Sequence, residues 1–160
     1  MVVADFGAGS GHYVIEAAKI VRNSGKVYAV DIQKELLSAI KSKAETNNLD
    51  NIEIIWSDLE AHNGSRLKEN SIDLVIISNI LFQSENKKII IDEARRILKN
   101  DERLAVIEWL KEDGTISMGP PNEQRIAKND CISLVAGLGF KMEKDFNAGG
   151  RHYGLIFKKL

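Results

Sequence analysis

The chain has 160 residues, of which 44% are hydrophobic and 28% are charged. This length is typical of one globular domain, and the composition can fill a hydrophobic core, which excludes a disordered chain and argues against a two-domain enzyme. With 22 basic and 23 acidic residues, the formal net charge is −1. The chain therefore lacks the basic excess of a nucleic-acid-binding protein, although that class stays open as an alternative.

The single cysteine, Cys131, cannot form an internal disulfide, and no Cys/His cluster has the spacing of a zinc site. The first residues lack the basic and apolar segments of a secretion signal. No apolar stretch approaches the roughly 20 residues of a membrane span. We therefore predict a cytoplasmic protein without a structural metal or a membrane segment.

Short β-branched runs alternate with longer segments whose apolar residues recur every three or four positions, which predicts β/α units. Several of the runs are almost wholly apolar, as are parallel strands that are covered on both faces. In chain order, the first five expected strands are Val2–Phe6, Lys26–Asp31, Ile52–Ser57, Ile72–Ser78 and Leu104–Trp109.

Helices are expected between these strands. The first, at about His12–Val21, is apolar on most sides and should be the most buried. The other two each carry an apolar stripe at helical spacing. These stripes are Leu36, Leu37, Ile40 and Ala44 in one helix, and Ile90, Ala94, Ile97 and Leu98 in the other.

The alternation of strands and helices changes after the fifth strand. A long connection, about Leu110 to Gln124, precedes a helix that carries Leu134, Val135 and Leu138 and should end at Gly139. Two further strands, Lys141–Phe146 and His152–Lys158, are joined by residues 147–150 and predict a hairpin. The predicted fold is an α/β open sheet of seven strands, five of them parallel, whose ligand lies beyond the carboxyl ends of the strands.

The most informative stretch, Ala4–Gly11, directly follows the first strand and opens the first helix. Its alternating glycines permit unusual backbone angles and let a ligand approach the chain, while the helix start offers free N–H groups. A tight turn without a ligand is the alternative. Asp31 ends the second strand and could accept hydrogen bonds from both hydroxyls of a ribose, or it could cap the next helix near Gln33.

Together, these features predict a cofactor that contains a nucleoside. Dinucleotides favour Gly-x-Gly-x-x-Gly, whose third glycine would fall on His12, whereas the spacing here is Gly-x-Gly-x-Gly. Asp5, two positions before Gly7, would repel a pyrophosphate but suits the ammonium group of an aminopropyl chain. An NAD(P)-dependent enzyme is therefore disfavoured.

Residues 5–11 followed by residues 27–31 resemble the first two motifs of class I S-adenosylmethionine-dependent methyltransferases. Residues 55–59 and 73–81 resemble the family's third- and fourth-strand segments, so the likeness covers nearly the whole chain. Met118–Pro121 followed by Arg125 is similar to a segment of small prokaryotic members near the quinone-biosynthesis and arsenite-methylating branches. Arsenite methylation needs several thiols, so a chain with only Cys131 argues against that substrate.

The resemblance implies a Rossmann-like sheet with an antiparallel last strand, S-adenosyl-L-methionine as the cofactor and S-adenosyl-L-homocysteine as the product. It places the methionine moiety on the glycine turn, the ribose on the end of the second strand and the adenine beside the third. The implied cofactor-binding residues are Asp5, Gly7, Ala8, Gly9, Gly11, Asp31, Ile32, Asp58, Leu59, Asn79 and Ile80.

Methyl transfer depends mainly on aligning donor and acceptor, so the sequence names no catalytic residue. Glu108 could accept a proton and Trp109 could wall the acceptor, whereas His152 and Tyr153 suit structural roles as well. We expect a small-molecule acceptor. An RNA or protein methyltransferase and a non-catalytic module that binds S-adenosylmethionine are the alternatives.

Most members of the family have helices before the first strand, whereas here the strand begins at Val2. We therefore expect residues 1–160 to form a single methyltransferase domain without that helical cover. Its cofactor site should be more open than usual, or closed by the 110–124 connection or by a second copy in a homodimer.

Overall fold

The computed structural model describes residues 1–112 and 118–160, so part of the predicted 110–124 connection lies outside the described residues. The strands are β1 (Val2–Phe6), β2 (Lys26–Asp31), β3 (Ile52–Trp56), β4 (Ile72–Ser78), β5 (Leu98–Trp109), β6 (Phe140–Asn147) and β7 (His152–Lys159). The α-helices are α1 (His12–Val21), α2 (Lys34–Thr46), α3 (Lys87–Ile97) and α4 (Lys128–Ala136).

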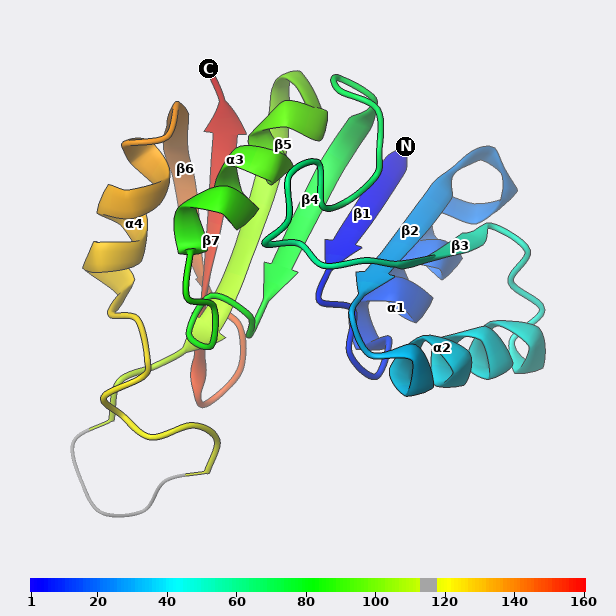
Figure 1. The fold of residues 1–160 in the computed structure, drawn as a ribbon, viewed down its shortest axis with the longest axis horizontal. Coiled ribbons are helices and arrows are strands. Elements are labelled where there is room, and N and C mark those ends of the chain that lie inside the picture. The colour runs from blue at the N-terminus through cyan, green and yellow to red at the C-terminus, as the bar shows by residue number, and fades with distance from the viewer. Residues whose placement is uncertain (113–117) are drawn as a thin grey trace.

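The seven strands form one sheet in the order β3-β2-β1-β4-β5-β7-β6. Strands β1 to β5 pair in parallel, and β7 runs antiparallel between β5 and β6. Figure 1 shows β1, β2, β4 and β5 ending at one edge, with β7 pointing the other way. This confirms the predicted Rossmann-like sheet. The strand order reverses between β1 and β4, and ligands of open α/β sheets bind at such a reversal.

Helices cover both faces of the sheet, as the apolar strands require. One core joins α1 and α2 to one face through Val14, Ala18 and Ile40, and the other joins α3 and α4 to the opposite face through Ile90 and Val135. Figure 1 shows α3 in front of β5 and β7, while α1 and α2 lie beside β2 and β3. No helix in the described ranges has the length and apolar character that a membrane crossing requires.

Several details differ from the sequence prediction. The first helix is not the most buried: α1 buries three residues and leaves Ile20 76% exposed, whereas α3 buries five. Leu98 is fully buried but starts β5 instead of ending the helix, because an apolar position satisfies either element. Leu138 lies beyond the end of α4, and Gly139, at φ 84°, follows the helix instead of ending it.

A buried acid ties α3 to the segment before β4. Glu93, 5% exposed, accepts hydrogen bonds from the Ser65 N–H and hydroxyl and from Arg96. Burial alone would raise the pKa of Glu93, but the hydrogen bonds from Arg96 and Ser65 outweigh it and hold the pKa below the ordinary value of 4.5.

Glu93→Gln should therefore lower the free energy of unfolding by about 2 kcal/mol at neutral pH, since it replaces charge-assisted hydrogen bonds in a buried place. A carboxyl with a depressed pKa stabilises the fold above its unfolded pKa, so the difference between the two proteins should shrink as the pH falls below 4.5. Urea unfolding across this range measures the effect. Equal midpoints at neutral pH would contradict it.

Candidate active site

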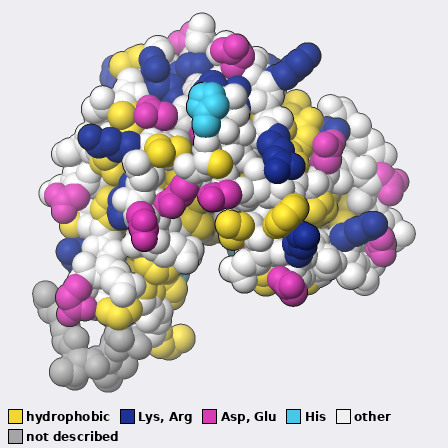
Figure 2. All heavy atoms as spheres, in the orientation of Figure 1, with side chains coloured by type: hydrophobic (Ala, Val, Ile, Leu, Met, Phe, Trp, Pro, Cys, Tyr) yellow, Lys and Arg dark blue, Asp and Glu magenta, His cyan; other side chains and the backbone are white. Residues whose placement is uncertain are grey.

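A cavity of about 580 Å³ lies at the edge where β1, β2 and β4 end. Its volume falls in the range of small-molecule sites. The space-filling view shows the molecule hollowed at its lower margin, on the side to which these strands point (Figure 2). Ten of the eleven predicted cofactor residues line the cavity, namely Asp5, Gly7, Ala8, Gly9, Asp31, Ile32, Asp58, Leu59, Asn79 and Ile80.

Gly11 is the predicted residue that does not line the cavity. It precedes α1 at φ 82°, and a Cβ there would lie 2.7 Å from Cγ1 of Ile40. Its lack of a side chain therefore serves the packing of α1 against α2. Gly7, at φ 71°, has a different constraint, because a Cβ there would overlap Cγ2 of Ile80 at the floor of the cavity.

The glycine turn is held to the end of β2. The N–H groups of Gly7 and Ala8 both donate to the Val30 carbonyl, at 2.8 and 3.1 Å. The Gly9 N–H donates to Oδ2 of Asp31 at 2.8 Å. The loop is therefore shaped before any ligand arrives, with its backbone facing the cavity.

Asp31 is 7% exposed and serves two neighbours. Besides the Gly9 N–H on Oδ2, its Oδ1 accepts the Gln33 N–H at 2.9 Å, next to the start of α2. Asp31 thus turns the chain toward α2 and also lines the cavity. The two sequence interpretations of this residue, a helix-start contact and a ligand contact, are geometrically compatible.

Asp5 is 2% exposed at the end of β1. Burial, together with the negative charge of Asp31, raises the pKa of Asp5 to about 8. Its Oδ1 has no hydrogen-bond partner among the described residues. A buried carboxyl with an unused oxygen is costly to the fold, and this one faces a cavity.

The ends of β3 and β4 complete the cavity. Asp58 is exposed after β3, and its Oδ1 accepts the Glu60 N–H at 2.9 Å. Asn79 adopts φ 56° after β4, and its buried Oδ1 has no partner in the described structure. Among the described residues, four buried side-chain polar atoms lack a partner, and three of them belong to residues that line this cavity: Asp5, Asn79 and His152.

Sequence reasoning missed several lining residues. His12 and Tyr13 directly follow the glycine turn, and Glu60 shares a hydrogen bond with Ser84 across the cavity wall. His12 and Tyr13 could have been found from their position directly after the glycine turn. The other lining residues that were not predicted are Ser10, Gln33, Leu36, Ser57, Ser78, Gln83 and Ile90, whereas His152 was considered only for catalysis or a structural role.

Of the side chains considered for catalysis, His152 lines the cavity, whereas Trp109 and Tyr153 do not. His152 lines the cavity, and burial and the nearby Arg125 lower its pKa, so the imidazole is neutral at neutral pH. Trp109 does not line the cavity, because its ring lies between His152, at 4.1 Å, and Gly119. Tyr153 donates to the Ile126 carbonyl at 3.0 Å, which is a structural role.

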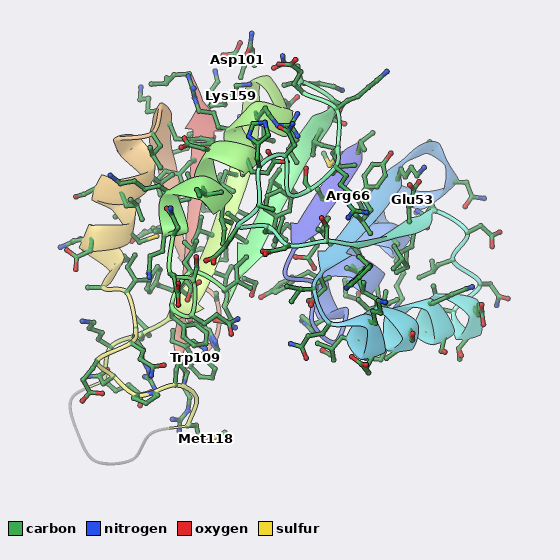
Figure 3. The ribbon with its side chains drawn as sticks, in the orientation of Figure 1. Glu53, Arg66, Asp101, Trp109, Met118 and Lys159 are labelled. Atoms are coloured by element: carbon green, nitrogen blue, oxygen red, sulfur yellow. The ribbon has the colours of Figure 1, made fainter. Side chains whose placement is uncertain are left out.

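The connection after β5 is held by one buried side chain. Arg125, 2% exposed, donates to the carbonyls of Leu110, Met118 and Pro120 at 2.7 to 2.9 Å. Its guanidinium also lies 5.5 Å from the centre of the Trp109 ring. Figure 3 shows Trp109 and Met118 toward the same end of the molecule, the end opposite Lys159 and Asp101.

Comparison with known proteins agrees with this geometry. A family model described as a methyltransferase domain matches residues 1–134. A probable cobalt-precorrin-6B C(15)-methyltransferase (decarboxylating) from Sulfurisphaera tokodaii is 26% identical over 142 residues, which cover 89% of this chain and 70% of that protein. A ubiquinone/menaquinone biosynthesis C-methyltransferase from Hahella chejuensis is 30% identical over 110 residues, covering 68% of this chain and 43% of that protein.

Among solved structures, a SAM-dependent methyltransferase from Aquifex aeolicus superposes with a TM-score of 0.89 at 26% identity, over 100% of this chain and 82% of that one. The chain belongs to the methyltransferase-domain family. It is a class I S-adenosylmethionine-dependent methyltransferase, and S-adenosylmethionine is its cofactor.

Proposed function

We propose that the cavity at the carboxyl ends of β1, β2 and β4 binds S-adenosylmethionine and that the protein transfers its methyl group to a small molecule. The observation that carries this proposal is the convergence of three unpartnered buried polar side chains on one cavity beside the glycine turn. Native proteins leave few such atoms unsatisfied, and a bound ligand that supplies their partners would explain why three of them gather around one cavity.

The free acceptor oxygens of the cavity fit this cofactor. Oδ1 of Asp5 is available to the ammonium group of the methionine moiety, and Asn79 offers a second free oxygen in the same cavity. The left-handed glycines leave room for a chain against the backbone. The negative charge of Asp31, joined by that of Asp5 when Asp5 ionises, disfavours a pyrophosphate in this cavity, which argues against a dinucleotide.

The other end of the cofactor would lie toward β2 and β3. Asp31 would take the ribose hydroxyls, Ile32 would pack on the adenine, and Asp58 with Leu59 would border its amino edge. Ile32 is 58% exposed and Leu59 is 8% exposed, so the proposed adenine site has one open and one closed side. The bound cofactor supplies a methyl group on positively charged sulfur, and these residues only hold and orient it.

A small-molecule acceptor is supported by the names of the relatives, which are methyltransferases of precorrin and quinone biosynthesis. His152 adds a neutral imidazole from β7 to a cavity otherwise lined by residues 5–90 of the described chain. We propose that residues 1–160 act as one domain, since β6 and β7 complete the sheet beyond the family match. A cytoplasmic location and a homodimer stay predictions of the sequence.

Calorimetric titration tests the proposal. S-adenosylmethionine and S-adenosylhomocysteine should both bind with one-to-one stoichiometry, whereas NAD should give no heat at millimolar concentration. Asp145→Asn on the distant strand β6 is the matched control and should leave the titration unchanged. Absence of binding by either adenosyl ligand at millimolar concentration would overturn the proposal.

A further inference from the structure

A buried carboxylate lies beneath the loop that follows β4, and the proposed methyl transfer does not use it. Glu108, one residue before the end of β5, is completely buried. Its Oε1 accepts the Leu81 N–H at 2.8 Å, and its Oε2 has no hydrogen-bond partner among the described residues. Glu108 is not part of the cavity lining.

Packing alone does not require an acid at this position. Side chains alternate along a strand, so Glu108 shares a face of β5 with Leu104 and Val106, which are buried in the core formed with α3 and α4. An apolar side chain would continue that core at no electrostatic cost, whereas a buried carboxylate costs several kcal/mol unless its partners compensate. The partners of Glu108 therefore indicate its role.

Those partners are backbone groups of the loop that forms the cavity floor. The N–H groups of Leu81, Ile80 and Phe82 all stabilise the charged form of Glu108. Asn79, held at φ 56°, and Ile80 line the cavity, and the Ile80 side chain occupies the space above Gly7. The carboxylate thus holds the backbone of the cavity floor without lining the cavity itself.

We propose that Glu108 is a positioning residue of the methyl-donor site, whose charged carboxylate holds the backbone of residues 80–82 so that Asn79 and Ile80 keep their places at the cavity floor. This inference rests on the proposed function and goes beyond it by making the shape of the floor depend on the charge of a residue that does not touch the ligand.

The surroundings of Glu108 bring its pKa into the neutral pH range. Burial raises the pKa of Glu108 to about 7, although the N–H groups of the loop and Lys87 on α3 oppose the rise. The titratable groups that face it from the other packed elements are Cys131 on α4 and Tyr153 on β7, and both stay neutral because burial raises their pKa values too. Above neutral pH the charged carboxylate of Glu108 accepts the hydrogen bond from the loop. Below neutral pH the carboxylate gains a proton, and its interaction with the loop weakens.

The backbone amide proton of Leu81 provides a local test, because hydrogen-bonded amide signals move when the acceptor changes charge. In a pH titration by NMR without ligand, this signal should move with a midpoint near 7 in the native protein and should not move in Glu108→Gln. Glu93→Gln removes another buried carboxylate from the same side of the sheet and should leave the Leu81 titration intact.

Binding of S-adenosylhomocysteine provides the second readout. Glu108→Leu should weaken binding by roughly 10- to 100-fold, and Glu108→Gln, which keeps one acceptor oxygen but not the charge, should recover only part of the loss at pH 8. If Glu108→Leu does not fold, Glu108→Gln and the Leu81 titration still decide. Failure of the native protein to bind the ligand would overturn the proposed function, whereas binding with no Leu81 titration and unaffected variants would overturn only the role of Glu108.

Discussion

Replacing Asp5 with asparagine is expected to weaken the binding of S-adenosylmethionine and S-adenosylhomocysteine by roughly 10- to 150-fold at pH 8, the equivalent of a charge-assisted hydrogen bond of about 1.5–3 kcal/mol. Asp5 is buried, and its Oδ1 is unpartnered beside the cavity. Asparagine keeps the size of the side chain but not the charge that an ammonium group requires. The loss should therefore appear as affinity and not as misfolding.

The ionisation of Asp5 should also make the affinity of the native protein depend on pH. The pKa of Asp5 in the free protein is raised to about 8, so below that pH the residue carries a proton that binding must remove. The affinity of the native protein should thus rise between about pH 6 and pH 8, by at most about tenfold per pH unit, and then level off. Titrations in buffers of different ionisation enthalpy should detect release of up to one proton, and less release from Asp5→Asn.

Whereas the affinity should rise with pH, the contribution of Asp5 to the free energy of unfolding should fall. A carboxyl whose folded pKa lies above the unfolded value of 3.8 destabilises the fold progressively as the pH rises toward 8. Without ligand, Asp5→Asn should therefore melt at a higher temperature than the native protein at pH 8. Asp145→Asn, an exposed acid on β6, is the control for both measurements. A flat pH profile with no proton release from the native protein would contradict the assignment of Asp5.

The second large effect is expected at Asp31. Asp31→Ala should weaken S-adenosylhomocysteine binding by roughly 30- to 150-fold, which corresponds to about 2–3 kcal/mol. Part of this loss belongs to the protein itself, because the Gly9 and Gln33 N–H groups lose their acceptor. Calorimetry with the natural ligand gives only the sum of the two contributions.

A 2′-deoxy analogue of S-adenosylhomocysteine separates the contributions. If Asp31 holds the ribose hydroxyls, the native protein should prefer the natural ligand over the analogue, and Asp31→Ala should bind both equally, as a double-mutant cycle requires. If Asp31 only shapes the turn, the native protein and the variant should show the same preference. Unchanged affinity of Asp31→Ala for the natural ligand would mean that the residue serves only the start of α2.

The five parallel strands with their terminal hairpin, and the place of ten predicted cofactor residues at the sheet edge, could be foreseen because both follow from local patterns. A parallel sheet brings the carboxyl ends of β1, β2 and β4 to one edge, so a motif placed at a strand end is also placed in the cavity. Gly11 does not line the cavity, and this could not be foreseen because a glycine required by a neighbouring helix has the same sequence signal as one required by a ligand.

Contacts between distant segments could not be foreseen. Nothing local distinguishes Glu108, buried under a loop that starts 29 residues earlier in the chain, from an accessible acid at a strand end. Trp109 is enclosed by His152 and Gly119, which depends on how the β5–β7 pairing and the following connection meet. Side chains that act across the sheet edge therefore needed the three-dimensional structure.

The three carbonyls bound by Arg125 have an evolutionary consequence. Leu110, at one end of the connection, is joined through a single guanidinium to Met118 and Pro120, on the other side of residues 113–117. Asn122 and Glu112 exchange two further hydrogen bonds across the same interval, so these contacts, and not only the number of residues between them, set the separation of the attachment points. Insertions and deletions in that interval can therefore accumulate between lineages while the neighbouring indole and imidazole keep their places.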